Sequence, residues 1–449
     1  MVTDTFFSRE PVIVASDFVG RKEAIAWVTA KLGARSPQNV NIIGEPKIGK
    51  SSLLRYIVSR QVGAVPQVQT VYVWLDLLTL PVCDSAHFWP FLLKQLQTAV
   101  SQASLTLPKA DEDLPPLEQI ADLLGALPRA ERPLRLILVI DAFERLSPEL
   151  SDRDLNWLRS LLTAHGEWLA FVISSPKPIG QLLAQREQTM IGSLFSEYFK
   201  DYYLVLLGDD ESIAFCRHAS AAFADGLSQQ DVDFLLAEAG PHPALLKMAC
   251  EYLLQAMARA SSRPYEDVAA DLRLDSGVQS LCKKLWLARS PEEQAMLFAL
   301  ARGQEAGDRQ LLVRKLGLAV QRNGRLQLFS RVFADFVRQQ PDIVNGETAV
   351  SSFLNGKSTI IHLPESRIVK KQGQEIVLTK LENRLLTYLR NHAGHVCTYE
   401  ELRRSVWKPE SKLHVVEKGV NRLRAKIEDD PDRPRYIISM RGEGYLWQE

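Results

Sequence analysis

The chain has 449 residues, a length that predicts two to four domains. Hydrophobic residues make up 46% and charged residues 24%, as in ordinary soluble proteins with packed cores. The formal net charge is zero, which excludes attachment to a polyanion through overall charge alone. Residues 361–449 nevertheless carry 17 Lys and Arg against 13 Asp and Glu, a local basic excess that suits a nucleic-acid contact.

The cysteines and apolar runs indicate the compartment. The five cysteines have neither the spacing of a metal site nor an even disulfide framework, which suits a reducing cytoplasm. The first ten residues lack a basic segment followed by an apolar run, so no secretory signal is expected. The longest apolar run, around 134–140, is too short to cross a bilayer. We expect a cytoplasmic protein without a membrane partner.

Five short apolar runs lie among helical patterns in the first half of the chain. They are rich in Val, Ile, Leu and aromatic residues, and most do not alternate with polar residues, as in strands covered on both faces of a parallel sheet. The runs span residues 40–43, 71–77, 134–140, 168–173 and 202–207. After an N-terminal segment at 1–17, we interpret residues 18–207 as a three-layer α/β domain.

Residues 44–52, GEPKIGKSS, fit the phosphate-loop pattern G-x-x-x-x-G-K followed by Ser or Thr, between a predicted strand and a predicted helix. In such a loop, backbone N–H groups surround the β-phosphate at the positive end of the helix. Lys50 is expected to reach the β- and γ-phosphates, and the Ser51 hydroxyl to bind Mg²⁺. The expected contacts with ATP or ADP are Gly44, Glu45, Lys47, Ile48, Gly49, Lys50, Ser51 and Ser52.

Polar residues at two further strand ends complete the predicted P-loop NTPase site. Asp141 ends the most apolar strand and is expected to hold the magnesium ion together with Ser51. Glu144 either orients a water for hydrolysis or is a solvated helix residue. Ser174 and Ser175 follow the next strand, where they either sense the γ-phosphate or simply form a loop.

From residue 208 the pattern becomes helical. Residues 231–257 predict two helices interrupted at 240–243, Gly-Pro-His-Pro, and Ser290 with Glu293 forms a capping box at the start of a further helix. A helix at 309–317, a hairpin at 318–329 and a helix at 330–340 follow. We interpret 208–280 as a helical lid, 281–341 as a winged helix and 342–355 as a linker.

Four segments together carry a family resemblance: FVGRKEAI at 18–25, the phosphate loop, VIDAFERL at 139–146 and GPHPALLKMAC at 240–250. They resemble the nucleotide-binding module of STAND NTPases, signal-transduction ATPases related to AAA+ proteins, over about residues 15–345. The resemblance implies that Pro243 packs against the base. The same motif also fits a helix stop and restart. The residues placed near the adenine are Phe18, Val19, Gly20 and Arg21.

Two positions depart from that family. Many relatives carry an acidic residue directly after the strand-terminal aspartate, where this chain has Ala142. Many also have an arginine in the segment that matches 174–178. In this chain the nearest basic residue is Lys177. Both changes remove groups that position water or stabilise developing charge. We therefore expect nucleotide binding with slow or absent hydrolysis, so that the chain is at most a slow ATPase.

The last part of the sequence has its own pattern. Short strands are predicted at 358–363, 367–372 and 374–379, and a wing hairpin at 436–447. Capping boxes open two helices, at Thr379 with Glu382 and at Thr398 with Glu401. With these features, residues 356–449 resemble the effector domain of OmpR/PhoB-type response regulators, an α+β winged helix-turn-helix domain that binds double-stranded DNA.

The predicted recognition helix spans 414–428. Its buried face is marked by helical spacing at Val416, Val420, Leu423 and Ile427. The opposite face carries His414, Lys418, Asn421, Arg422 and Ala425. The resemblance implies that Arg422 contacts a DNA base and that Arg441 enters the minor groove. At position 419, where this chain has glycine, relatives usually have a larger residue. The implied phosphate contacts are Lys412, His414, Lys418 and Asn421. The alternative is a solvated basic face on a protein-docking module.

These elements predict a nucleotide-switched DNA-binding transcriptional regulator. ATP and ADP would favour different placements of the lid and so control the winged-helix output domain. A nucleotide-dependent homo-oligomer and an upstream signalling protein are the expected protein partners. The alternatives are a DNA-stimulated ATPase, and a STAND signalling or defence protein whose terminal winged helix docks another protein.

Overall fold

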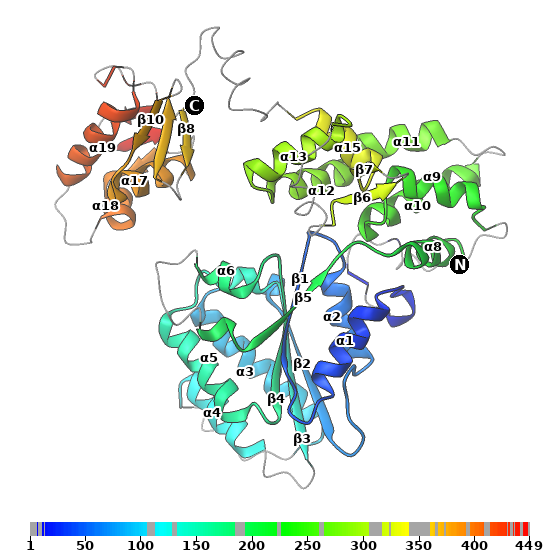
Figure 1. Ribbon diagram of the computed structural model, residues 1–449. Helices are drawn as coiled ribbons and strands as arrows, with labels where there is room; N and C mark the ends of the chain where they lie inside the picture. The colour runs from blue at the N-terminus through cyan, green and yellow to red at the C-terminus, as the bar shows by residue number, and fades with distance from the viewer. Residues whose placement is uncertain are drawn as a thin grey trace. The chain divides into compact units, whose positions relative to one another are not determined.

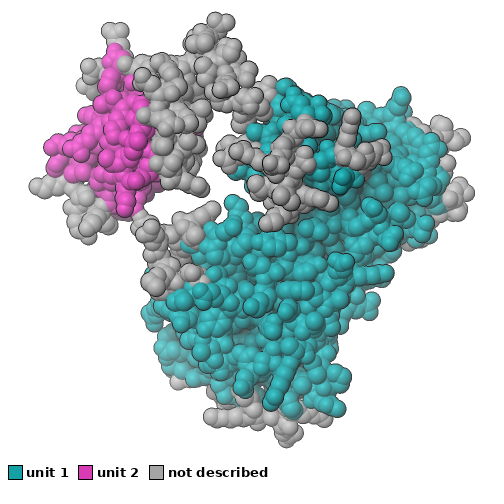
Figure 2. All heavy atoms as spheres, in the orientation of Figure 1, with its two compact units in different colours: residues 1–341 teal, residues 342–449 magenta. Residues whose placement is uncertain are grey.

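The computed structural model divides the chain into two compact units, Met1–Pro341 and Asp342–Glu449 (Figures 1 and 2). It describes residues 7, 11–12, 14–105, 113–127, 133–184, 194–221, 226–259, 265–304, 317–322, 325–340, 360–363, 367–371, 374–391, 396–407, 414–428, 430–431, 434, 436–440 and 443–447. The predicted helix at 309–317, except for its last residue, and the linker at 342–355 lie outside the described residues.

A five-stranded parallel sheet forms the centre of the first unit, in the order β2-β3-β4-β1-β5. The strands are β1 (Asn39–Gly44), β2 (Gln69–Asp76), β3 (Leu134–Asp141), β4 (Leu169–Ser175) and β5 (Phe199–Leu204). The register pairs Ile43 with Ser175, and Asp76 with Asp141. The phosphate loop, Asp141 and the two serines therefore emerge at the same edge of the sheet.

Helices cover both faces of this sheet, and the alternation of β3 shows which helices lie where (Figure 1). Ile137 and Val139 pack with α1 (Lys22–Leu32) and α2 (Lys50–Ser59). Leu136 and Leu138 pack on the other face with α3 (Ser85–Gln102), α4 (Pro116–Ala126) and α5 (Asp152–His165). The predicted three-layer α/β domain is confirmed. No helix in the described part of the chain is long and apolar enough to span a membrane.

The position of the last strand corrects the sequence prediction. β3 and β4 are buried at every residue, as expected of central strands. The run at 202–207 was predicted as a strand, but β5 begins at Phe199 and ends at Leu204. The chain leaves the sheet after Leu204 because the backbone groups that follow form hydrogen bonds outside the sheet. The Val205 carbonyl accepts a hydrogen bond from Arg21, and the Leu207 amide donates to the Pro241 carbonyl.

In the residues that the structure describes, helices and one hairpin make up the rest of the first unit. The lid helices are α8 (Asp209–Ala219), α9 (Gln229–Glu238), α10 (Pro243–Arg259) and α11 (Tyr265–Leu274). They are followed by α12 (Ser276–Leu287), α13 (Pro291–Ala301), β6 (Ala319–Arg322), β7 (Arg325–Leu328) and α15 (Arg331–Arg338). The predicted helix break at Gly-Pro-His-Pro, the capping box at Ser290 and the antiparallel hairpin are confirmed. Shorter elements are α6 (Ile179–Ala184), η1 (Ala15–Asp17), η2 (Leu77–Thr79) and η4 (Phe143–Arg145).

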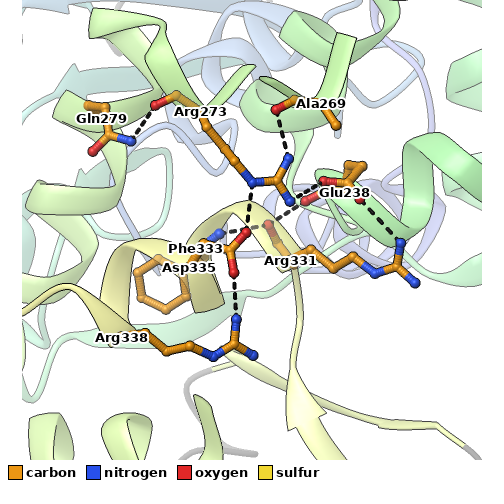
Figure 3. Close-up of polar contacts among 9 residues, drawn as sticks. Glu238, Ala269, Arg273, Gln279, Arg331, Phe333, Asp335 and Arg338 are labelled. Atoms are coloured by element: carbon orange, nitrogen blue, oxygen red, sulfur yellow. Dashed lines mark hydrogen bonds and ion pairs between the residues drawn. The ribbon is translucent and has the colours of Figure 1, made fainter. Parts of the chain in front are cut away.

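A network of ion pairs joins the lid helices α9 and α11 to α15 (Figure 3). The buried carboxylate of Glu238, at the end of α9, lies 2.9 Å from Arg273 Nη2 and 3.2 Å from Arg331 Nη1. Arg273 Nε also donates to Asp335 Oδ2 at 2.7 Å, and Asp335 pairs with Arg338. A buried carboxylate needs such compensation. The network therefore holds α9, α11 and α15 together as one body.

The Gly-Pro-His-Pro turn packs directly on Phe329, the residue that follows β7. Gly240 has φ +67°, a left-handed conformation that L side chains rarely adopt. A Cβ atom added there would lie 2.1 Å from the Phe329 carbonyl oxygen. Glycine is thus required at 240 both for the turn and for the close approach of two backbones.

The second unit is a winged-helix domain with two three-stranded sheets, in the orders β10-β9-β8 and β11-β13-β12. The strands are β8 (Ile360–Leu363), β9 (Ile368–Lys371), β10 (Gln374–Val377), β11 (Val396–Thr398), β12 (Ile437–Met440) and β13 (Gly444–Trp447). The helices are α17 (Lys380–Asn391), α18 (Tyr399–Val406) and α19 (His414–Ile427). The capping boxes at Thr379 and Thr398 are confirmed. The three helices pack around Trp447 and Tyr445.

Replacing Gly240 with alanine tests the close approach at the lid turn. We expect Gly240→Ala to lower the free energy of unfolding of the first unit by about 2–4 kcal/mol, because left-handed strain and overpacking add together. Gly125, exposed in α4 with open space around it, is the matched control. Gly125→Ala should be neutral or stabilise by up to about 1 kcal/mol. Urea unfolding of both variants measures the difference, and equal midpoints would contradict the packing described here.

Candidate nucleotide site and DNA-binding module

The phosphate loop connects β1 to α2 through two glycines with different roles. Gly49 has φ +105° and precedes the first residue of α2, with open space around a notional Cβ. Gly44 has no room for a side chain, since a Cβ there would lie 2.8 Å from the Leu204 carbonyl oxygen. Gly49 therefore sets the turn, and the backbone N–H groups at the start of α2 are left for an anion.

Lys50 lies folded back over this loop. Its Nζ donates to the carbonyl oxygens of Gly44, at 2.7 Å, and Glu45, at 3.1 Å. Burial lowers the pKa of Lys50, and the negative charges of Glu144, Glu45 and Asp141 oppose that effect. The ammonium group is therefore held among three carboxylates at the edge of the sheet.

Asp141 ends β3 as predicted and is buried. Its Oδ1 accepts hydrogen bonds from Ser174 Oγ at 2.5 Å and from the Ala142 amide at 3.1 Å. Ser175 Oγ lies 2.8 Å from Asn41 Oδ1 and 2.7 Å from the Lys177 carbonyl oxygen. Both serine hydroxyls thus have partners within the protein. Ser174 supports Asp141 through a direct hydrogen bond. Their role toward the γ-phosphate stays a prediction.

Glu144 lies in η4, half-buried beside this group. Burial raises the pKa of Glu144, and the nearby Lys50 charge opposes the shift. Its Oε2 is buried and has no hydrogen-bond partner among the described residues. This oxygen is therefore available to a water or to an incoming donor. Ala142, two residues before Glu144 at the start of η4, has φ +61°, a conformation that sequence reasoning did not foresee.

The Phe-Val-Gly-Arg segment lies against the phosphate loop. Phe18 stacks on Tyr56 of α2, with ring centroids 4.7 Å apart. Arg21 is buried and donates from Nη2 to the Ile48 carbonyl at 2.7 Å and from Nη1 to the Val205 carbonyl at 2.5 Å. Burial lowers the pKa of Arg21 to about 10, so the side chain stays charged at neutral pH. Arg21 ties the loop to the chain that leaves β5, and its predicted place near the adenine stays a prediction.

The lid touches the loop through His242, to which sequence reasoning gave no contact. The side chain is fully buried, and Nε2 lies 3.2 Å from the Pro46 carbonyl oxygen. Burial lowers the pKa of His242 to about 4. The ring is therefore neutral, and because a carbonyl only accepts, Nε2 carries the hydrogen. Nδ1 has no hydrogen-bond partner among the described residues. Pro243, the first residue of α10, was the residue expected at the base.

A second contact to the loop comes from the segment after α12. Arg289 Nη2 lies 2.6 Å from both carboxylate oxygens of Glu45. The exposed fractions of the two side chains are 7% and 14%, so the pair is largely out of water. Burial raises the pKa of Glu45, and the arginine opposes that shift. Sequence reasoning missed this pair, because 244 positions separate the two residues and no local pattern marks them.

The recognition helix α19 has the two faces that its sequence predicts. Val416, Val420, Leu423 and Ile427 are fully buried in the core of the second unit. The exposed residues on the other side are His414, Lys418, Asn421, Arg422 and Ala425. Lys412 and Arg441 lie outside the described residues.

Two other basic residues of α19 hold the helix in place. Arg424 is buried and donates to the Ile437 carbonyl from Nε, at 3.0 Å, and from Nη2, at 2.5 Å. Nη2 also donates to Ser439 Oγ at 2.8 Å. Lys426 Nζ pairs with Glu382 Oε2 at 2.7 Å. These contacts fix α19 against β12 and α17 and leave Lys418 and Arg422 as its outward cations.

Gly419 has a structural reason to be glycine. A Cβ at this position would lie 2.4 Å from Cζ2 of Trp407, the residue that follows α18. The indole ring therefore fills the space that a larger residue at 419 would need. The absence of a side chain at Gly419 therefore allows Trp407, at the end of α18, to pack closely against α19.

Comparison with known families agrees with this geometry. Residues 17–173 match the family model described as an AAA ATPase domain. Residues 373–447 match the one described as the C-terminal part of transcriptional regulatory proteins. The chain thus joins an AAA ATPase domain, which implies nucleotide binding, to a winged-helix DNA-binding domain of transcriptional regulators.

Solved structures of similar fold include a Walker-type ATPase of Pyrococcus abyssi, at 15% identity over 74% of this chain and 99% of that chain, with a TM-score of 0.49. The ORC2 protein of Aeropyrum pernix matches at 16% identity over 75% and 98%, with a TM-score of 0.45. The DNA-binding domain of CadC from E. coli matches at 26% identity over 20% and 85%, with a TM-score of 0.18. With these TM-scores the three likenesses carry no functional conclusion.

The two arginines of α19 should respond differently to mutation. Arg424→Ala should lower the free energy of unfolding of the second unit by about 1.5–3 kcal/mol, because it removes charged hydrogen bonds to a buried carbonyl. Arg422→Ala, on the exposed face, should change it by less than about 0.5 kcal/mol. Thermal unfolding of the full chain compares the two variants. If Arg424→Ala unfolds like the wild type, the holding role of Arg424 is wrong.

Proposed function

We propose that this protein is a nucleotide-switched DNA-binding transcriptional regulator of the STAND type. ATP or ADP bound at the phosphate loop controls the winged-helix output domain. One observation carries the proposal: residues of the lid and of the segment after α12 contact the loop itself. His242 contacts the Pro46 carbonyl, and Arg289 contacts the Glu45 carboxylate. A nucleotide bound in that loop therefore lies beside the hydrogen bonds that hold the lid residues to the loop.

The loop residues fit a nucleotide. The start of α2 presents unpaired backbone N–H groups, and Gly49 leaves open space beside them. Lys50 exchanges its two loop carbonyls for phosphate oxygens when a nucleotide binds. The Ser51 hydroxyl and the Asp141 carboxylate are the candidate protein groups for Mg²⁺, which typically keeps several waters and takes only one or two protein ligands. Bound Mg²⁺ would neutralise phosphate charge.

Slow hydrolysis suits a switch, since a nucleotide that persists can hold a state. The methyl side chain of Ala142 cannot position a water. In the segment 174–178, which follows β4, the only basic side chain is that of Lys177. The unpartnered Oε2 of Glu144 favours the second candidate function, a DNA-stimulated ATPase, because it retains a group for water activation. Steady-state turnover with and without duplex DNA distinguishes the two. Strong stimulation by DNA favours the ATPase.

The output is contact with double-stranded DNA through α19. Arg422 reads a base edge in the major groove, while His414, Lys418 and Asn421 contact phosphates. We extend the same roles to Lys412, for phosphate, and Arg441, for the minor groove. Nucleotide-dependent homo-oligomers would place several winged helices on adjacent half-sites, and so raise avidity without new base contacts. An upstream signalling protein would set the nucleotide state.

Nucleotide binding is tested by replacing the loop lysine. Lys50→Ala should weaken binding of ATP or ADP at least about tenfold, since it removes a charge-assisted contact with phosphate. Lys94→Ala, on the exposed side of α3, is the control and should bind like the wild type. Isothermal calorimetry with Mg²⁺ measures both. Equal affinities for Lys50→Ala and wild type would refute the assignment of the loop.

Coupling between the two sites is tested by DNA titration of the full chain with ATP, with ADP and without nucleotide. We expect affinities that differ by about 5–150-fold between states, the usual range of allosteric coupling. In Lys50→Ala the curves should converge, because a ligand that is not bound shifts no equilibrium. Three superimposable wild-type curves would reject the switch and leave the nucleotide as a structural ligand.

A further inference from the structure

The acidic residue in the phosphate loop is unexpected in a site for a polyanion. Glu45 follows Gly44 directly, and its backbone carbonyl accepts a hydrogen bond from Lys50 at 3.1 Å. A carboxylate at that place repels the phosphates that Lys50 attracts. In this structure its charge is met by Arg289, at 2.6 Å from both oxygens.

Arg289 has hydrogen-bonding capacity beyond this pair. Its side chain is 7% exposed, and Nε is buried without a hydrogen-bond partner among the described residues. A guanidinium carries five N–H donors in a fixed plane, suited equally to carboxylate and phosphate oxygens. A buried donor without a partner costs free energy unless a ligand accepts its hydrogen bond. His242 Nδ1 and Glu144 Oε2 also lack a hydrogen-bond partner among the described residues, but both are acceptors and do not attract a phosphate.

We propose that Arg289 is a phosphate-binding residue of the nucleotide site and that Glu45 is its internal competitor. The inference rests on the function proposed above and names the regulation of that site. The Glu45 carboxylate holds the guanidinium in place of a nucleotide phosphate. A bound nucleotide takes Arg289 from Glu45, and each added phosphate strengthens that competition.

The exchange has a mechanical consequence because of where Arg289 lies. It stands between the end of α12, where its amide bonds to the Trp286 carbonyl, and Ser290, the N-cap of α13. A change of partner at Arg289 therefore moves the joint of these two helices. The Glu238 network ties α9, α11 and α15 together, so such a movement involves several helices at once (Figure 3).

A purely structural ion pair gives a different outcome. If Arg289 and Glu45 only hold the lid down, removing either partner breaks the same contact, and Arg289→Lys, which keeps the charge of the pair, leaves the preference for the ATP analogue over ADP unchanged. If Arg289 binds phosphate, removing the competitor strengthens binding and removing the arginine weakens it. Opposite signs fit the phosphate-binding role, but the change of charge beside the loop also produces them, so a reduced ATP preference in the charge-conserving variant Arg289→Lys identifies the role.

The experiment is calorimetry of the full chain with ADP and with a non-hydrolysable ATP analogue, both with Mg²⁺ at one salt concentration. Arg289→Gln should weaken binding about tenfold or more, and more for the ATP analogue than for ADP. Glu45→Gln should tighten binding by about fivefold or more. The charge-matched controls Arg153→Gln and Glu118→Gln, exposed on α5 and α4, should match the wild type.

Shifts of the same sign in Arg289→Gln and Glu45→Gln, or no shift in Arg289→Gln, would overturn the inference. Should Arg289→Gln fail to fold, Arg289→Lys takes its place. It keeps the charge without the planar fork, and it should lose part of the ATP preference while it unfolds like the wild type. An unchanged preference in Arg289→Lys also overturns the inference. If the wild type binds neither nucleotide, the proposed function itself fails, a result distinct from unshifted variants of a wild type that binds.

Discussion

The backbone carbonyls of the phosphate loop organise the first unit. Four carbonyls of the loop accept hydrogen bonds from side chains outside it, which restrict the loop although its glycines would allow many conformations. The donors are Lys50 to Gly44 and Glu45, His242 to Pro46, and Arg21 to Ile48. Because these donors come from α2, the lid and the segment before α1, the loop is also the place where the three parts meet.

Local signals in the sequence predicted the elements and the loop, whereas the contacts between distant elements had no such signal. The capping boxes, the helix break at 240–243 and the buried face of α19 follow from residues within one or two turns. The end of β5 was misplaced, because Val205 and Leu207 continue an apolar run but bond to Arg21 and Pro241. The pair Glu45–Arg289 depends on the folded arrangement alone, which composition and spacing do not encode.

In the second unit, the structure separates two kinds of basic residue that look alike in the sequence. Arg422 and Arg424 are two positions apart on α19, yet one is exposed and the other is buried on the Ile437 carbonyl. Helical geometry places neighbours two apart on different faces, and the wing strand β12 supplies an acceptor for the inner one. The outer face leaves Lys418 and Arg422 exposed. Trp407 over Gly419 sets how closely α18 approaches α19.

The protonation of His242 gives the lid contact a defined response to acid. With His242 buried against Pro46, here termed the closed lid, its pKa is about 4, whereas a solvated imidazole, as an open lid would leave it, titrates near 6.5. Above about pH 6.5 the ring is neutral whether the lid is closed or open, so the contact is indifferent to small changes of pH. Between about 6.5 and 4, only an open lid takes up the proton, and each pH unit then favours opening by up to about 1.4 kcal/mol. Near neutrality the contact between His242 and Pro46 is therefore insensitive to pH, and protonation weakens it only in acid.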